Sequence, residues 1–407
     1  MKVAIIGAGA SGLMAAVSAA QSADVTVYEK NQNTGKKLFI TGKGRCNLTN
    51  LCSPSECIDN IVNGKKFLYS AIYSFPPQKT VDFFENLGVK LKVERGRRVF
   101  PVSDKSSDIV AALTRAAARS GVKFVFSEVY GIDKTAGGFE VKTCDERCEY
   151  DKIILACGGM SYPATGSTGD GYKFAQKFGH EIVRPRPALV PLILKDDVAC
   201  LQGLSLKNVS ASVTTGKTGK KYTQFGEMLF TGSGVSGPII LTLSSFINKY
   251  DLDGAKLSVD LKPALDPEVL DKRLVHDFQK YQNKCFKNSL NDLLPKKLID
   301  FFVAKCGIDP DKKVNAVTKA ERAKIVGMLK KLEFDIRACD RIEAGIITAG
   351  GVALDAINPK TMESKLTPGL YFAGEVMDVD ALTGGYNLQI AFATGYVAGK
   401  HAGEDNL

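Results

Sequence analysis

A glycine pattern at the start of the chain constrains the fold more than any other feature. Gly7, Gly9 and Gly12 follow the apolar run Lys2 to Ile6, which predicts a β-strand, a glycine-rich turn and then a helix over 12–22. The first glycine permits a tight turn, the second lets backbone approach a pyrophosphate, and the third lets the helix pack on the strand. Amides at the N-terminus of that helix face the anion. The pattern therefore predicts a dinucleotide site.

An acidic residue after the next predicted strand supports this interpretation. Val25 to Tyr28 is apolar, and Glu29 follows it, 17 residues after Gly12. A carboxylate at this point can accept hydrogen bonds from both ribose hydroxyls. Glu29 followed by Lys30 suits an unphosphorylated ribose, which favours FAD or NAD over NADP.

The C-terminal segment distinguishes between these two dinucleotides. An apolar strand from Leu370 to Ala373 runs into Gly374 and Glu375, and Gly384-Gly385 then opens a helix through Gly399. FAD, unlike NAD, calls for a C-terminal segment that comes back to the dinucleotide site. Its ribityl chain can bind a carboxylate, and a helix N-terminus stabilises the negative charge on its N1–C2=O edge. A strand and helix that only complete the sheet would explain the apolar residues, but not the paired glycines beside the acid.

Strand and helix patterns alternate before residue 184, and a glycine-rich apolar segment of the same character follows residue 343. This alternation predicts an α/β domain with a mainly parallel sheet. The segment RPRPALVPL carries three prolines in nine residues and predicts the end of the first part of this domain. The expected organisation is a split FAD-binding domain (1–190 and 343–407), an inserted β subdomain (191–262 and 332–342) and a helical subdomain (263–331). Single helices are expected over 66–87, 109–120, 267–284, 290–306 and 318–331.

Composition narrows the functional classes. No apolar stretch approaches the ~18 residues of a membrane span, so we expect a cytoplasmic protein without membrane contact. The ten cysteines form no CxxC motif, and only three histidines are present, so we expect free thiols and no metal site. Residues 263–331 hold 15 Lys+Arg against 9 Asp+Glu within a net charge of +10. A solvated helical face explains this surplus better than a nucleic-acid partner.

The stretch TGKGRCNLTN (41–50) follows the predicted dinucleotide strands and is not a P-loop, because its lysine precedes glycine and its glycine spacing is wrong. Amides of Gly42 and Gly44, and the charge of Lys37, Lys43 or Arg45, could offset two phosphates. We interpret this stretch as a loop that clamps the cofactor.

These segments together resemble one known family. The GAGASG start, GKGRCNLTN, ILACGG and the long C-terminal stretch beginning ITAGGVALDAINPK look like the BaiN/RdsA family of bacterial NAD(P)/FAD-dependent oxidoreductases, also labelled aminoacetone-oxidase-like. The resemblance implies non-covalent FAD and a two-dinucleotide-binding-domain FAD fold (Rossmann-like) with a β-barrel-like insertion bearing helices. It also implies that Arg45, Cys46 and Asn47 lie close to the flavin. One departure is Gly232, which stands in FTGSGVSGP where the family commonly has histidine, so a proton-transfer role for that histidine does not carry over.

Motif and resemblance together give the predicted cofactor-binding set. Its members are Gly7, Gly9, Ala10, Ser11, Gly12, Glu29, Lys30, Lys37, Leu38, Gly42, Gly44, Arg45, Cys46, Asn47, Val129, Gly158, Gly374, Glu375, Asp378, Gly385, Tyr386, Asn387 and Leu388. Val129 is included because the strand around it can read the adenine ring through its backbone.

The expected activity is hydride transfer through flavin N5 between a donor and a small organic substrate such as an enone. No second GxGxxG with a downstream acid exists, so an NAD(P)H donor would stack transiently on the flavin. Cys46, Tyr162 and Tyr386 are the candidates for catalytic roles. An amine oxidase that uses oxygen, and a non-catalytic flavin-dependent redox or RNA-associated factor, remain open as alternatives.

Overall fold

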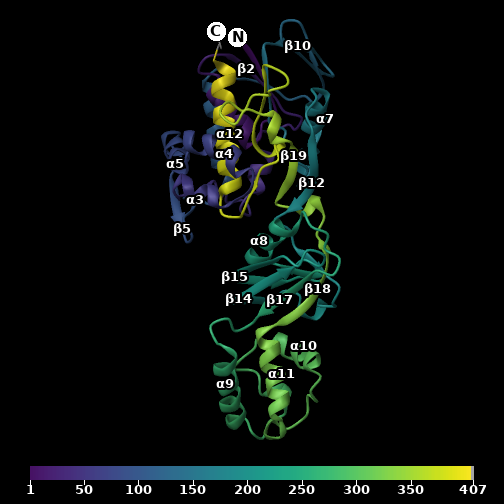
Figure 1. Ribbon diagram of the computed structural model, residues 1–407. Coiled ribbons are helices and arrows are strands. Elements are labelled where there is room, and N and C mark those ends of the chain that lie inside the picture. The colour runs from purple at the N-terminus through teal and green to yellow at the C-terminus, as the bar shows by residue number, and fades with distance from the viewer. Residues whose placement is uncertain (405–407) are drawn as a thin grey trace. The chain divides into compact units, whose positions relative to one another are not determined.

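The computed structural model describes residues 1–404, which form two compact units (Figure 1). The first unit joins Met1–Ala188 to the segment that begins at Ile342, and the second unit is Leu189–Arg341. In Figure 1 the purple N-terminal segment and the yellow C-terminal helix lie together within the first unit. The two ends of the chain therefore build one body.

A five-stranded parallel sheet forms the centre of the first unit. Its order is β20 (Leu370–Phe372), β11 (Lys152–Leu155), β1 (Lys2–Ile6), β2 (Asp24–Tyr28) and β7 (Lys123–Val125). β1, β11 and β20 are almost wholly buried apolar runs, as expected for parallel strands covered on both faces. The chain adds β2 and β7 on one side of β1 and β11 on the other. The carboxyl ends of β1 and β11 are therefore the switch point at which such sheets bind ligands.

Two helices pack on each other beside this sheet at very short range. α1 (Ala10–Ala19) is rich in alanine, and α12 (Tyr386–Gly403) carries Gly395, Gly399 and Gly403 four residues apart on one face. A Cβ at Gly395 would lie 2.3 Å from the Ser11 carbonyl oxygen, and one at Gly399 would lie 2.3 Å from that of Ala15. Only glycine lets the two backbones come this close.

The remaining elements of the first unit surround this core. The helices are α2 (Lys36–Ile40), α3 (Pro54–Asp59), α4 (Lys65–Ser74), α5 (Pro77–Asn86), α6 (Ser106–Arg119) and α7 (Asp170–Lys177). The strands are β3 (Thr49–Asn50), β4 (Ile61–Asn63), β5 (Leu91–Glu94), β6 (Arg98–Pro101), β8 (Val129–Lys134), β9 (Phe139–Thr143), β10 (Arg147–Tyr150), β12 (Ile182–Ala188), β19 (Ile347–Val352) and β21 (Asp380–Ala381).

One predicted helix differs from the sequence-based expectation, and the proline-rich segment folds as a strand. The single helix expected over 66–87 is two helices, α4 and α5, because Pro76 and Pro77 break it and Pro77 starts the second helix. The proline-rich segment near residue 184 is strand β12, which pairs antiparallel with β19 and carries an irregularity between Val183 and Arg186. Proline is tolerated at such an irregular position.

The second unit contains a closed six-stranded barrel. Its order is β13 (Leu192–Leu194), β16 (Gly234–Ser236), β15 (Lys221–Phe230), β14 (Ser205–Thr214), β17 (Lys256–Asp260) and β18 (Leu332–Cys339). Side chains of β14 and β17 alternate, so that Val213 and Leu257 are buried while Ser212 and Ser258 are partly exposed. The helices of this unit are α8 (Pro238–Ile247), α9 (Pro267–Lys280), α10 (Lys296–Cys306) and α11 (Lys319–Lys330). Helix α8 is not expected from the sequence, because its residues form one apolar run.

Candidate functional site

The glycine turn after β1 has two closed positions and one open position. A Cβ at Gly7 would lie 2.6 Å from the Ala156 oxygen, and one at Gly12 would lie 1.9 Å from the Gly7 oxygen. A Cβ at Gly9 would meet no atom within 4 Å. Gly9 is the N-cap of α1 and no side chain caps this helix, so the amides of Ala10 and Ser11 have no side-chain acceptor there. Gly9 is therefore the position at which a phosphate can approach the backbone.

Glu29 is held beside this turn. Its Oε2 accepts a hydrogen bond from the Ala8 amide at 2.9 Å, and its Oε1 accepts from the Asn31 amide at 2.9 Å and from Asn31 Nδ2 at 2.7 Å. These bonds fix the carboxylate at the carboxyl end of β2. The neighbouring Lys30 instead forms an ion pair with Asp170 at 2.6 Å. Lys30 therefore neutralises a carboxylate of the chain itself.

Lys37 and Glu375, which are far apart in the sequence, form an ion pair. Lys37 Nζ lies 2.8 Å from Glu375 Oε2 and 2.6 Å from the Ser161 hydroxyl. Glu375 Oε1 also accepts from the Thr348 amide at 2.8 Å. Each side chain is about one-quarter exposed. The pair joins α2 to the segment after β20, and it leaves neither charge unpaired.

The opening of the 41–50 stretch has an unusual backbone. Gly42, Lys43, Gly44 and Cys46 all have φ between +59° and +83°. For Lys43 and Cys46 this conformation is uncommon, and such residues cluster at functional sites. Cys46 is fully buried, and burial raises the pKa of its thiol to about 12. The thiol is thus protonated at neutral pH, which favours a packing role over a nucleophilic one.

Arg45 and Asn47 differ in whether their polar groups already have partners within the chain. Arg45 forms ion pairs with Glu94 and Asp104 and covers the Phe100 ring at 4.3 Å, so its charge is already neutralised by the chain. Asn47 has a buried side-chain oxygen, Oδ1, without a hydrogen-bond partner. A buried acceptor of this kind is costly unless a ligand or water donates to it. Of the two, Asn47 is the better candidate for cofactor contact.

The second glycine turn precedes α12 and is closed by the chain. Gly385 has φ +101°, and a Cβ there would lie 2.4 Å from the Thr49 carbonyl carbon. Asn387 fixes the turn by accepting from the Ala381 amide and donating to the Ala381 oxygen. Gly385 is thus required for packing, whatever else it contacts.

Tyr386 is 8% exposed, and burial raises the pKa of its hydroxyl to about 12. Leu388 is partly buried.

A buried glutamine that the sequence analysis missed holds this turn in place. Gln389 is fully buried, and its Oε1 accepts from the hydroxyls of Thr49 at 2.7 Å and Thr80 at 2.8 Å. Its Nε2 donates to the Phe75 oxygen at 2.7 Å. In the sequence, this role is indicated only by the position of a polar residue within the apolar run of residues 388–393.

The other predicted residues lie on several elements of the first unit. Gly374 has φ +77°, and a Cβ there would meet Ser11 Oγ at 2.6 Å. Asp378 Oδ1 accepts from the Gly350 amide, and burial raises the pKa of this carboxyl. Gly158 follows β11 with φ +71°. Leu38 and Val129 are buried core residues, and Val129 starts β8.

Two tyrosines near the loop after β11 differ in exposure. Tyr162 has φ +51° and is 37% exposed. Tyr172, which the sequence analysis did not single out, is buried with an unpartnered hydroxyl, and burial raises its pKa. Thr348 was also missed. Its hydroxyl accepts from the amides of Met160 and Ser161, and these bonds tie this loop to β19.

The site as a whole suits a flavin dinucleotide. Glu29 lies beside the first glycine turn, and Lys37 pairs with Glu375. Gly374 packs on Ser11, and the 49–50 segment contacts the second glycine turn. The open position at Gly9 can take phosphates, and the orphaned oxygen of Asn47 can accept from a polar ring edge. Lys30 and Arg45 are paired with carboxylates of the chain. Within residues 1–404, no group of three His, Cys, Asp or Glu could hold a metal, and no helix is long and apolar enough to cross a membrane.

Comparisons with known proteins show the family to which the chain belongs. The model of the family described as HI0933-like protein Rossmann domain matches residues 1–401. The 3-dehydro-bile acid delta(4,6)-reductase of Clostridium scindens is 32% identical over 99% of both chains. The ribosomal RNA dihydrouridine synthase of Haemophilus influenzae is 30% identical over 96% of both chains. The protein of the same name from Escherichia coli is 29% identical over 97% of this chain and 96% of its own.

Proposed function

Because the chain belongs to the HI0933-like Rossmann family and is an FAD-dependent oxidoreductase, we propose that it reduces a carbon–carbon double bond conjugated to a carbonyl group. The family membership agrees with the resemblance seen in the sequence. The observation that carries the proposal is the chemistry shared by the relatives' names. A 3-oxo-Δ4,6 steroid and a uracil base both present a C=C bond conjugated to C=O, and both named reactions saturate such a bond.

The chain's own residues would hold and orient the cofactor. The amides of Ala10 and Ser11, beside the open Gly9, would bind the pyrophosphate, and Glu29 would bind the adenosine ribose. Asn47 Oδ1 would accept a hydrogen bond from the polar edge of the ring system. Bound FAD supplies a two-electron centre that exchanges hydride at N5. NADH or NADPH would act as a transient donor, since the sequence holds no second dinucleotide motif.

Reduction of an enone also requires a proton at the carbon next to the carbonyl. Tyr386 is the residue we assign to hold this proton. Its pKa of about 12 keeps the phenol protonated at neutral pH, and it is the first residue of α12. Cys46 is the weaker candidate because it is fully buried. Tyr162 is exposed and serves as the comparison residue.

A uracil base within RNA is a second candidate substrate, favoured by one feature of the second unit. A groove of about 660 Å³ runs over the outer face of β14, β15 and β17 and is lined by hydroxyls and lysines, including Ser212, Lys221 and Lys256. Two carboxylates, Asp260 and Glu333, also line it and form ion pairs with Lys330 and Lys331. This unit holds 25 Lys+Arg against 18 Asp+Glu, most of the net charge of the chain. Such a surface suits a phosphate backbone better than a steroid. Charge composition alone does not favour a nucleic-acid partner, and the groove adds the feature that supports one.

Anaerobic half-reactions test the proposal. One sample is reduced with NADH or with NADPH, and a steroid 4-en-3-one or a short uridine-containing RNA is then added. A second sample, with its flavin still oxidised, receives a primary amine in place of NADH or NADPH. Reoxidation of the flavin absorbance with a saturated ketone as product supports the small-molecule substrate, whereas dihydrouridine in the RNA supports the second candidate. Flavin that is reduced by the amine and reoxidised only by oxygen would refute both and favour an amine oxidase.

A further inference from the structure

Two cysteines occupy the paired positions that flank the N-terminus of α3. Ser53 is the N-cap of this helix and forms a capping box with Glu56, which places Cys52 immediately before the cap and Cys57 at the fourth helical position. Side chains at these two positions pack on each other in the hydrophobic staple. In this chain both are thiols, and they are hydrogen-bond partners. The helix cap thus pairs two cysteines that are five residues apart and form no CxxC motif.

The two thiols have different surroundings. Cys52 is 9% exposed and lies beside Arg97, which forms an ion pair with Glu56 at 2.9 Å. The hydrogen bond from Cys57 and then the charge of Arg97 lower the pKa of Cys52. Cys57 is fully buried, and the hydrogen bond to Cys52 together with burial raises its pKa. Both thiols are buried, but Cys52 keeps 9% exposure and is the more readily ionised of the two, so it is the nucleophile and the fully buried Cys57 is the resolving partner.

The pair is connected to the turn that opens α12. The Cys52 amide donates to the Asn50 oxygen at 2.8 Å, and Asn50 Nδ2 donates to the Gly384 oxygen at 3.3 Å. The Thr49 carbonyl packs against Gly385. The segment 49–52 therefore joins the dithiol to the second glycine turn. Burial raises the pKa of the Tyr386 hydroxyl, and the positive charge of Arg97 opposes this shift.

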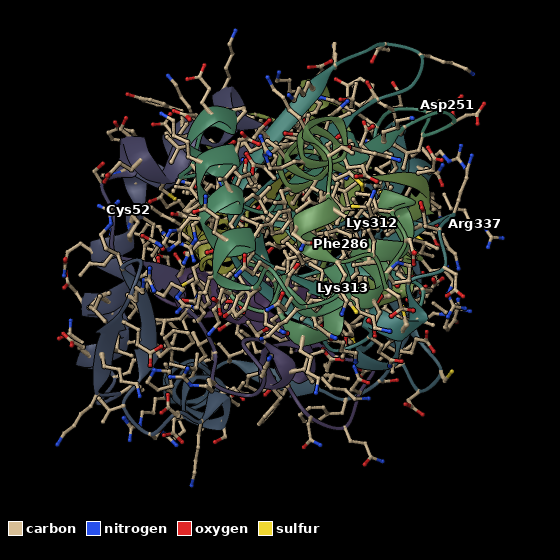
Figure 2. The ribbon with its side chains drawn as sticks, turned by 90° about the horizontal axis from the view of Figure 1, so that it is seen from below. Cys52, Asp251, Phe286, Lys312, Lys313 and Arg337 are labelled. Carbon is tan, nitrogen blue, oxygen red and sulfur yellow. The ribbon has the colours of Figure 1, made fainter. Side chains whose placement is uncertain are left out.

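We propose that Cys52 and Cys57 form a redox-active dithiol that a low-molecular-weight disulfide converts into an intramolecular disulfide. Figure 2 labels Cys52 among the purple-blue ribbons of the first unit. The Cys52 thiolate attacks one sulfur of the small disulfide, which forms a mixed disulfide and releases one thiol. The Cys57 thiol then loses its proton and attacks Cys52 Sγ, which closes the intramolecular bond and releases the second thiol. Two protein thiols are oxidised and one small disulfide is reduced to two thiols.

Oxidation of this pair changes the cofactor site through the 49–52 segment. Closing the disulfide draws Cys52 toward α3 and moves Asn50 and Thr49, which support the start of α12. We expect the disulfide form to bind FAD more weakly than the dithiol form, by roughly fivefold or more, the lower end of couplings between linked sites. This step rests on the family's use of FAD and not on the proposed substrate.

The test uses the full chain and glutathione disulfide, with free thiols alkylated and mapped by peptide mass spectrometry. The expected result is a Cys52–Cys57 disulfide that forms before Cys144 or Cys200 is modified, although both of these are more exposed. Cys57→Ser should trap glutathione on Cys52, and Cys52→Ser should leave Cys57 unmodified. The Cys144→Ser variant, as the matched control, should form the disulfide normally.

Three outcomes would overturn the proposal. They are a stable glutathione adduct on wild-type Cys52, modification of Cys144 and Cys200 ahead of Cys52, and no reaction at Cys52 in any variant. The coupling is tested separately by titrating FAD into the oxidised and the reduced wild-type protein. Equal FAD affinities would refute the coupling and leave the substrate proposal untouched.

Discussion

The two glycine turns that precede α1 and α12 differ although they look alike in sequence. Each opens a helix that no side chain caps. At the first turn a Cβ on Gly9 would meet nothing within 4 Å, whereas at the second turn a Cβ on Gly385 would lie 2.4 Å from the Thr49 backbone. The first turn leaves room for a ligand and the second is filled by the chain. Glycine in a predicted cofactor motif is thus evidence of close approach, but the approaching group can be the protein itself.

The two turns are nevertheless mechanically linked. The helices that follow them pack backbone to backbone through Gly395 and Gly399. Gly374, just after β20, packs against Ser11 in the first turn of α1. Damage at the second turn can therefore reach the first, so each variant below is judged by both stability and FAD affinity.

The largest expected effect is loss of stability in Gly385→Ala. The new methyl group would overlap the Thr49 backbone at a position where φ is +101°, and overpacking together with a left-handed conformation costs about 3 kcal/mol or more. Chemical denaturation of the FAD-free protein measures this cost. Gly88→Ala is the matched control, because Gly88 has φ +85° and no neighbour within 4 Å. The free energy of unfolding of this control should fall by only about 1–2 kcal/mol. Equal losses of stability in the two variants would show that the second turn is not tightly packed.

Tyr386→Phe should slow the reaction without releasing FAD. Loss of a proton donor typically slows the chemical step about a hundredfold or more. Since a pKa of about 12 keeps the hydroxyl neutral at every lower pH, no rate change between about pH 6 and 10 should arise from its ionisation. Rates of flavin reoxidation by substrate, measured across that range, test both points. Tyr162→Phe should behave like wild type, and the reverse ranking of the two variants would move the proton donor to Tyr162.

Glu29→Ala should weaken FAD binding by about ten- to a hundredfold. Hydrogen bonds to a charged carboxylate contribute about 1.5–3 kcal/mol, and the same carboxylate also fixes the Ala8 amide in the first turn. Fluorescence titration with FAD measures the loss, and Asp24→Ala on the same strand is the control. Turnover at saturating FAD should survive, so a hundredfold loss of turnover there would contradict the assignment of Glu29 to the remote ribose.

Cys46→Ala should have the smallest effect. The thiol is buried and protonated, so its removal should cost about 1 kcal/mol of stability and leave turnover at saturating FAD within a factor of two or so. Denaturation and steady-state rates measure the two quantities. Loss of activity with an unchanged fold would restore Cys46 as a catalytic residue.

Sequence patterns predicted the features that depend on local rules. The strand–turn–helix around Gly7 to Gly12, the acid at Glu29 and the C-terminal return to the sheet follow from glycine geometry and apolar periodicity. Ion pairs over long sequence distances could not be predicted this way. Nothing local shows that Lys37 meets Glu375, or that Arg45 is neutralised by Glu94 and Asp104.

The burial of individual polar residues also could not be predicted from the sequence. Gln389 and Thr348 organise the site from within the core, and their roles depend on contacts with residues far along the chain. The cysteine pair at α3 was visible only as a spacing that matched no known motif. The capping geometry of the helix, rather than the spacing, brings the two thiols together.

Gly9→Ala tests the difference between the two turns most directly. Gly9 has an extended backbone (φ −81°, ψ −168°) that alanine adopts readily, and its side-chain direction is empty. The denaturation midpoint of the FAD-free variant should therefore equal that of wild type, while FAD affinity falls by about tenfold or more because the methyl group occupies the path of the pyrophosphate. Wild-type FAD affinity in this variant would contradict the account, because the dinucleotide would then not pass over the open glycine of the first turn.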